Sequence, residues 1–142
     1  IGFVGYAGGS ASALTDPAEA ARFARETEVD AMAVAVGNTH LQTRHSEGIN
    51  EAAVHAIAAA TGRRVPLVIH GGSGVPPDQR THLARTTPIA KFNIGTELRQ
   101  TFGTALRQTL QDHPQEFDRL KILSATEAPL TTRAREILRS LG

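Results

Sequence analysis

Four stretches of apolar residues that alternate with helical patterns constrain the fold of this chain most strongly. The predicted strands cover residues 1–4, 30–37, 66–70 and 89–94. The second stretch, DAMAVAVG, is almost unbroken apolar sequence, as expected for a strand that is buried on both faces of a parallel sheet. Strands that alternate with helices are connected as parallel βαβ units. We therefore predict an α/β fold built on a parallel sheet.

Helix signals follow each of these strands. Asp16, with Pro17 after it, is a strong N-cap for the first helix, and Asn50 can cap the second. A third helix is predicted over residues 76–87, and Thr96 can cap a fourth. The predicted buried faces are Ala20, Phe23, Ala24 and Thr27 in the first helix, Val54, Ile57 and Ala58 in the second, Leu98, Phe102, Ala105 and Leu106 in the fourth, and Ala134, Ile137, Leu138 and Leu141 in a last helix.

Two architectures fit this order of elements, an open doubly wound sheet and a (β/α)8 TIM barrel. A full barrel takes roughly 250 residues, whereas this chain has 142. Four strand–helix units are half of a barrel, and the chain begins within apolar sequence and without Met, which suggests a piece of something longer. We predict that residues 1–142 are about half of a TIM-barrel domain, with four βα units followed by a C-terminal helix.

Composition excludes several classes of function. The 15 Lys and Arg residues nearly balance the 14 Asp and Glu residues, so no basic surface for nucleic acid or membrane is expected. The chain has no cysteine, which excludes disulfides and Cys-ligated zinc. It also has neither a leader pattern nor an apolar run near the ~20 residues that span a membrane. We expect a soluble cytoplasmic domain that binds neither nucleic acid nor membrane.

Polar, glycine-rich sequence follows three of the predicted strands, where a barrel places its chemistry. The segments are GNTH at residues 37–40, HGGSG at 70–74 and NIGT at 93–96. His40 and His70 follow adjacent strands, and two neutral imidazoles that converge there are half of a catalytic zinc site, which uses three protein ligands and keeps one position open. Either histidine alone could instead be a hydrogen-bonded loop residue.

The glycines of HGGSG and NIGT predict an anion site. Glycine lets the backbone turn sharply and bring N–H groups close to an anion. Barrels frequently bind phosphate at the loops after their seventh and eighth strands. NIGT also opens a helix, whose unpaired N–H groups and dipole favour an anion. Ordinary glycine turns are the alternative for each segment taken alone.

Three segments together resemble consecutive blocks of the class II, metal-dependent ketose-bisphosphate aldolases, best of all the fructose- and tagatose-bisphosphate branch. They are VDAMAVAVGNTH, VPLVIHGGSGVP and IAKFNIGTELR. The resemblance implies a (β/α)8 TIM barrel of which this chain is about the C-terminal half. It also implies a lyase of carbohydrate metabolism, of the glycolytic type. Such an enzyme cleaves a ketose 1,6-bisphosphate to dihydroxyacetone phosphate and an aldehyde phosphate through a zinc-stabilised enediolate.

The family's site residues carry over to matching positions. His40 and His70 match two of three ligands of the Zn²⁺ cofactor, and the third belongs to the N-terminal half. Asn93 matches the residue near the enediolate, and the carbonyls of Gly71 and Ser73 lie where the family often binds Na⁺ or K⁺. The substrate is a small phosphosugar, and the family forms homo-oligomers, either dimers or tetramers. The residues that match its phosphate and substrate loops are Gly71, Gly72, Ser73, Asn93, Ile94, Gly95 and Thr96.

The chain departs from the family pattern in three places. Leu41 stands where the family has a glycine, and residues 5–13 lack the acidic residues of the family's first loop, one of which is proposed as the proton-abstracting base. The tail lacks the usual Asp-Pro-Arg-aromatic segment, which leaves Arg133 as a candidate for the second phosphate. The general acid and base are not identifiable in this chain. A non-catalytic phosphosugar-binding or subunit-stabilising relative therefore stays open.

Lys91 precedes Asn93 by two residues and shares its face of the strand. It could form a Schiff base, as in metal-independent aldolases. A buried structural lysine paired with a carboxylate is the alternative that we favour. The other histidines are predicted to lie in loops or on helix surfaces, and they are His45, His55, His82 and His113.

Overall fold

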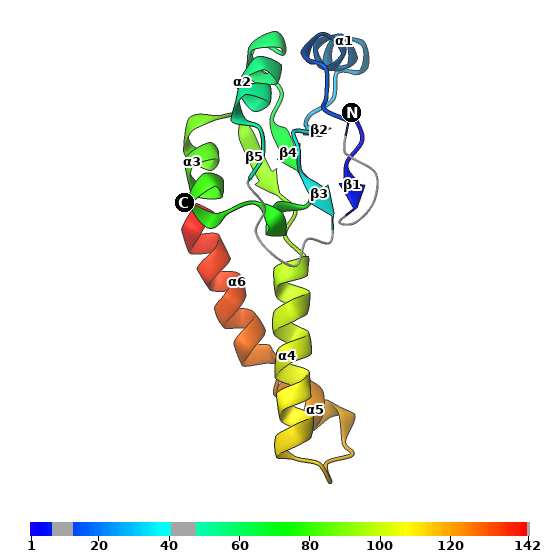
Figure 1. Cartoon of the computed structure of the whole chain (residues 1–142), viewed down its shortest axis with the longest axis vertical. Coiled ribbons are helices and arrows are strands. Elements are labelled where there is room, and N and C mark those ends of the chain that lie inside the picture. The colour runs from blue at the N-terminus through cyan, green and yellow to red at the C-terminus, as the bar shows by residue number, and fades with distance from the viewer. Residues whose placement is uncertain (7–12, 41–47, 142) are drawn as a thin grey trace.

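Figure 1 shows a computed structural model of the chain, with a parallel sheet at one end and a pair of long helices extending from it. The structure describes residues 1–6, 13–40 and 48–141, without the side chains of Tyr6 and His40. Its strands are β1 (Gly5–Tyr6), β2 (Met32–Val34), β3 (Thr39–His40), β4 (Leu67–Ile69) and β5 (Ile89–Phe92). Its helices are α1 (Pro17–Thr27), α2 (Glu51–Ala60), the 3₁₀ turn η1 (Gly72–Gly74), α3 (Pro77–Thr86), α4 (Thr96–Asp112), α5 (Arg119–Ser124) and α6 (Glu127–Leu141).

The named strands are paired in parallel, which confirms the predicted α/β fold. β4 lies between β2 and β5, so that Met32 is opposite Leu67 and Leu67 is opposite Ile89. β1 pairs with β3, which continues the chain just beyond β2. The amino group of Ile1 donates a hydrogen bond to the carbonyl of Ala33 at 2.7 Å. The parallel segments therefore lie beside one another in the order in which they occur in the sequence.

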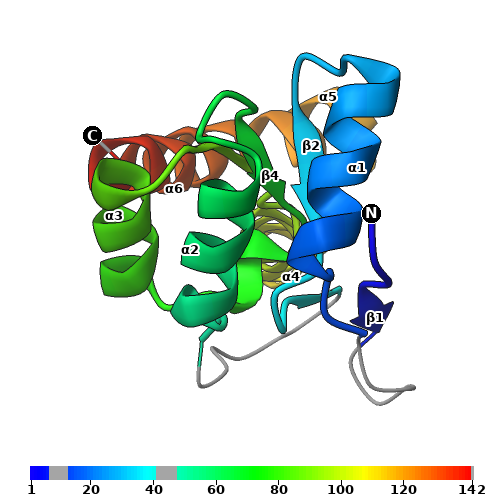
Figure 2. The ribbon, with the colours of Figure 1, turned by 90° about the horizontal axis from the view of Figure 1, so that it is seen from above.

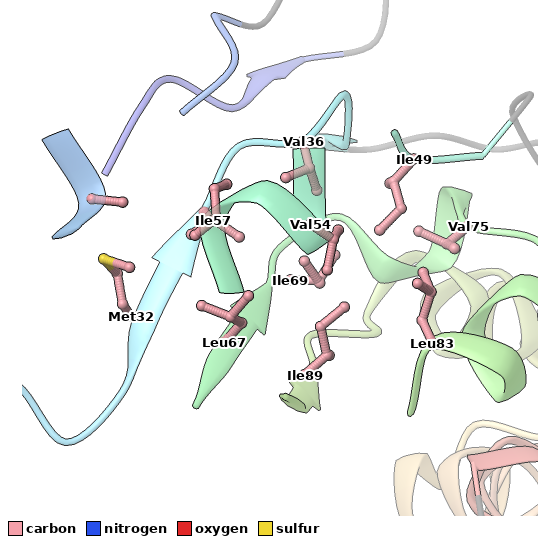
Figure 3. Close-up of a cluster of buried hydrophobic side chains, with 12 residues drawn as sticks. Met32, Val36, Ile49, Val54, Ile57, Leu67, Ile69, Val75, Leu83 and Ile89 are labelled. Atoms are coloured by element: carbon pink, nitrogen blue, oxygen red, sulfur yellow. The ribbon is translucent and has the colours of Figure 1, made fainter. Parts of the chain in front are cut away.

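One face of the sheet is closed by helices and the other is open. α1, α2 and α3 lie side by side along the closed face (Figure 2). On the other face, Ala33, Val68 and Lys91 lie in register, and they are half-buried, half-buried and exposed in that order. Figure 3 shows the core under the helices, with Met32, Leu67, Ile69 and Ile89 of the strands, Val54 and Ile57 of α2, and Leu83 of α3. Val34 of β2 belongs to the same core.

Two of the predicted helix caps are present and one is wrong. Asp16 accepts hydrogen bonds from two amides of the first turn of α1, both at 2.9 Å. Asn50 accepts one from the first turn of α2 at 3.0 Å. In α4 the N-cap is Gly95, not Thr96, and no side chain caps the helix. The N-cap residue of α4 therefore offers no side-chain acceptor to the amides of the first turn.

The predicted first strand, residues 1–4, is also wrong. Gly2 has a φ of +80°, which is incompatible with a strand, and Phe3 forms an antiparallel bridge with Ala13. The regular pairing begins later, in β1. The second strand is shorter than predicted, and beyond it Gly37 has a φ of +92° that turns the chain between β2 and β3.

The helix faces are only partly as predicted. The buried residues of α2, Val54, Ile57 and Ala58, are confirmed. In α1, which packs against α2, the buried residues are Ala20 and Ala21, whereas Phe23 is 37% exposed. In α6 Ile137 is buried and Leu138 is 68% exposed. The sequence also gave no prediction of α5, which Asp118 caps by accepting a hydrogen bond from Leu120.

None of the helices in the described part of the chain is both long and apolar enough to pass through a membrane. The longest, α4, is amphipathic and only half-buried on its apolar side. It packs against α6, which returns towards the sheet and contacts α3 (Figure 1). The C-terminal helices are thereby connected to the end of the sheet where the predicted site residues lie.

Candidate functional site

The loops after β4 and β5 lie against each other at the carboxyl ends of the strands. The amide of Gly72 donates to the carbonyl of Asn93 at 3.0 Å, and the amide of Asn93 donates to the carbonyl of Ile69 at 2.8 Å. A Cβ on Gly72 would lie 3.2 Å from the Asn93 oxygen and 3.2 Å from Cγ1 of Ile94, so glycine favours this close approach. Gly71 has a φ of +64°, in the left-handed region. The segments HGGSG and NIGT thus form one continuous surface.

His70 and Asn93 are brought together by this surface. Nδ2 of Asn93 lies 3.2 Å from Nδ1 and 3.4 Å from Nε2 of His70. Because the two distances are nearly equal, the amide lies across the imidazole instead of along the lone pair of one nitrogen. The side chains of the predicted zinc ligand and of the predicted catalytic asparagine are therefore neighbours.

Asn38 connects the end of β4 to the segment between β2 and β3. Its Nδ2 donates to the carbonyl of His70 at 2.9 Å, and its Oδ1 accepts from the amide of Val36 at 2.7 Å. The side chain is 3% exposed, so both bonds are sheltered from water. Asn38 thereby fixes the backbone position of His70 relative to the turn that leads to His40.

The backbone of His40 lies in β3, opposite Tyr6 of β1 and two residues after Asn38. Its side chain, the departure at Leu41 and the loop histidine His45 lie outside the described residues. Among the side chains that are described, no three His, Asp or Glu residues form a group that could hold a metal. The structure therefore describes the surroundings of one of the two predicted zinc ligands.

Ser73 lies in η1 and faces the first turn of α4. Its Oγ accepts a hydrogen bond from the amide of Glu97 at 3.3 Å, and the residue is 6% exposed. Because the oxygen accepts here, the hydroxyl proton is available to another acceptor. Gly95 and Thr96 begin the helix beside it, with amides that no side chain caps. A hydroxyl donor next to an uncapped helix N-terminus favours an anion.

Glu97 is buried between two arginines. Its Oε1 lies 2.8 Å from Nη1 of Arg80, and its Oε2 lies 2.6 Å from Nη2 of Arg133. Arg133 also pairs with Glu136 at 2.9 Å. The hydrogen bond to Glu136, and then that to Glu97, raise the pKa of Arg133 against the opposing effect of burial. Arg133, the sequence candidate for a second phosphate, is thus occupied by two carboxylates.

Arg80 is 1% exposed. It also extends towards HGGSG, the segment that is predicted to bind phosphate. Its Nη1 lies 3.5 Å from the carbonyl of Gly72, at the limit of a hydrogen bond, and its buried Nε has no partner within the described part of the chain. The sequence reasoning missed Arg80, Glu97 and Asn38. A signal for Arg80 was available, because it precedes the buried Leu83 by three residues and so lies on the buried side of α3.

Lys91 is exposed on the open face of the sheet. No described element covers this face, which the predicted other half of the barrel would enclose, so the burial of Lys91 against a carboxylate stays a prediction. His55, His82 and His113 are exposed, as predicted. His82 lies 3.8 Å from a carboxylate oxygen of Glu51 on the neighbouring helix.

Comparison with known proteins relates this geometry to one family. The family model described as fructose-bisphosphate aldolase class-II matches residues 1–142. The sulfofructosephosphate aldolase of Alkalicoccus urumqiensis is 33% identical over 129 residues, which are 91% of this chain and 44% of that protein.

Solved structures show the same likeness. The YdjI aldolase of Escherichia coli K12 superimposes with a TM-score of 0.75 and 34% identity, over 92% of this chain and 44% of that one. The fructose-bisphosphate aldolase of Campylobacter jejuni shares the fold, with a TM-score of 0.67 and 17% identity over 90% of this chain and 45% of that one. The chain therefore spans slightly less than half the length of these relatives.

Proposed function

Because the chain belongs to the class-II fructose-bisphosphate aldolase family, we propose that it is part of a metal-dependent aldolase. The proposed enzyme cleaves a ketose 1,6-bisphosphate, of the fructose or tagatose type, to dihydroxyacetone phosphate and an aldehyde phosphate. The observation that carries this proposal is the continuous surface of HGGSG and NIGT. This surface presents His70, Asn93 and Ser73 together at the strand ends, beside the uncapped N-terminus of α4.

We also propose that residues 1–142 form about the C-terminal half of a (β/α)8 TIM barrel. Three observations support this fold. The parallel segments follow one another in chain order, the helices cover one face, and the other face carries half-buried or exposed residues that a closed barrel would cover. The chain also aligns with somewhat less than half of the YdjI aldolase.

In this proposal the phosphate of dihydroxyacetone phosphate binds between η1 and α4. Ser73 has a hydroxyl proton to donate, because its oxygen already accepts from the amide of Glu97. Gly72 lets the two loops approach without a side chain between them. The uncapped amides at Gly95 and Thr96 supply further donors, and the dipole of α4 favours the negative charge.

His40 and His70 would hold the Zn²⁺ ion, with a third ligand from outside this chain. The donor chemistry fits, because neutral imidazole is an ordinary zinc ligand and the bond from Asn38 fixes the backbone of His70. When bound, the metal supplies a Lewis acid for negative charge on the substrate oxygens. The carbonyls of Gly71 and Ser73 are the proposed ligands of a Na⁺ or K⁺ ion.

Asn93 would orient the substrate at the reacting carbons. Its backbone N–H is held by Ile69 of β4 and its C=O by Gly72 of η1, and its side chain lies beside His70. A carboxamide donates and accepts hydrogen bonds but does not take up a proton at neutral pH. Asn93 therefore positions an oxygen of the substrate, and the proton-abstracting base is another group.

The test is cleavage by the full-length protein. We expect dihydroxyacetone phosphate to be released from fructose or tagatose 1,6-bisphosphate, with activity lost on chelation and restored by Zn²⁺. Sulfofructose phosphate belongs in the same assay, because a relative is named for it. Phosphate binding without cleavage of any of the three would favour the non-catalytic relative. A borohydride-trapped adduct at Lys91 would favour the Schiff-base mechanism instead.

A further inference from the structure

We propose that Glu97 is a positioning residue for the phosphate site, and that Arg133 on α6 holds it in place. This inference rests on the proposed function, since it concerns the same phosphate. Glu97 makes contact with the site through its amide, which donates to Oγ of Ser73 at 3.3 Å. Its carboxylate makes no such contact and points to Arg80 and Arg133.

The carboxylate of Glu97 joins three elements to the first turn of α4. Arg80 comes from α3, Arg133 comes from α6, and the same Arg80 guanidinium approaches the carbonyl of Gly72 at 3.5 Å. The first turn of α4 is therefore fixed relative to η1 from two directions, through Ser73 and through Arg80. A shift of Glu97 would change the spacing between the Ser73 hydroxyl and the uncapped amides.

Arg80, Glu97, Arg133 and Glu136 form a charge cluster that is compatible with an anion bound next to it. An unpaired carboxylate in the first turn of α4 would repel a phosphate a few ångströms away. Arg80 and Arg133 carry the two positive charges of the cluster, and Glu97 and Glu136 carry its two negative charges. The cluster is thereby neutral, so the donor hydroxyl and amides determine the local field.

Stability alone is a weak reason for such a cluster. Buried ion pairs contribute little net stability, because desolvation offsets much of the attraction. Arg80 also leaves its buried Nε without a partner in the described part of the chain, which costs further free energy. A cluster of this kind, placed directly behind the proposed phosphate site, is accounted for by a positioning role.

Arg133 is the residue to change, because its side chain is 35% exposed whereas that of Arg80 is 1% exposed. Arg133→Met keeps the aliphatic stem and removes the charge. Arg135→Met on the same helix is the matched control, because Arg135 is exposed. Arg133→Lys restores the charge without the planar pair of donors.

The experiment uses the full-length protein, with fructose 1,6-bisphosphate as substrate and inorganic phosphate as competitive inhibitor. For Arg133→Met we expect both KM and the inhibition constant of phosphate to rise roughly tenfold, with kcat within about twofold of the wild type. Arg133→Lys should recover part of the phosphate affinity, and Arg135→Met should match the wild type.

Three results would overturn the inference. The first is an unchanged inhibition constant for phosphate in Arg133→Met. The second is an equal loss in Arg135→Met. The third is a rise in KM for the bisphosphate alone, which would make Arg133 a direct contact for the second phosphate. If the wild type neither cleaves a ketose bisphosphate nor binds phosphate, the proposed function fails instead.

Discussion

At the scale of single residues, the two histidines determine whether the strand ends can hold a metal. We predict that His40→Ala and His70→Ala each abolish aldol cleavage and strip zinc from the full-length protein, because a catalytic site left with two protein ligands binds zinc weakly. The measurements are zinc content per chain and the cleavage rate. His55→Ala, an exposed histidine on α2, is the control and should change neither. Full activity in either site variant would contradict the zinc assignment.

Ser73 and Asn93 lie on the same surface, but we expect substitutions at the two positions to have different kinetic effects. Ser73→Ala removes a hydroxyl donor to phosphate, so we expect weaker substrate binding by roughly 1.5–3 kcal/mol, about 10- to 150-fold in KM. Asn93→Ala should lower kcat more than it raises KM, because its side chain lies at His70 and the reacting carbons. The measurements are kcat and KM of both variants. An equal rise in KM in both, with kcat unchanged, would contradict the distinction between their roles.

Asn38 carries a prediction about stability that the sequence did not suggest. Asn38→Ala removes the acceptor of the buried Val36 amide and one donor to the partly buried His70 carbonyl. Each unsatisfied buried group costs about 1–3 kcal/mol. We expect a clear fall in the free energy of unfolding in urea, accompanied by lower zinc affinity, because His70 loses its anchor. Unchanged stability would show that water replaces the amide.

At the scale of elements, the sequence predicts most of the helices and strands and misses what tertiary contacts decide. The caps at Asp16 and Asn50 are local patterns, and both are confirmed. The prediction for Thr96 is wrong because Gly95 takes the N-cap when the loop docks against η1. The position of Arg80 three residues before Leu83 was a local signal for its burial, but its pairing with Glu97 on another helix was not visible in any local pattern.

Experiment can distinguish a helix N-terminus that a side chain caps, as in α1, from one that no side chain caps, as in α4. Asp16→Ala removes a cap that accepts two hydrogen bonds, so we expect a loss of about 1 kcal/mol in the free energy of unfolding. Thr96→Ala removes no cap and should change stability by less than about 0.5 kcal/mol. Thermal or urea denaturation of both variants provides the comparison. A larger loss in Thr96→Ala would mean that its hydroxyl supports α4 after all.

At the scale of the whole molecule, the sequence predicts the helix-covered face of the sheet better than the open face. The face under the helices is as expected from the apolar strands, because Met32, Leu67 and Ile89 lie opposite one another in the core. The opposite face was expected to be a barrel interior, and Lys91 there is exposed. A local pattern shows which side of a strand is apolar but not whether another segment covers it. The predicted dimer or tetramer stays a prediction.

The open face leads to the last prediction, for residues 1–142 expressed alone. Ala33 and Val68 lie on that face, and the unpaired edge of a short parallel sheet promotes association. We expect this piece to associate and to lack cleavage activity, as measured by light scattering during size exclusion and by an assay with fructose 1,6-bisphosphate.

Two substitutions identify the surface that drives this association. Val68→Lys places a charge on the open face and should reduce it, because a buried unpaired charge is costly. Phe117→Ser removes an apolar side chain that is 93% exposed and lies two residues before α5. Figure 1 places α5 at the end of α4 away from the sheet, so this change should leave association unchanged. The opposite outcome would place the interface on the C-terminal helices. A folded monomer that cleaves the substrate at the full rate would contradict both the half-barrel fold and the need for residues outside this chain.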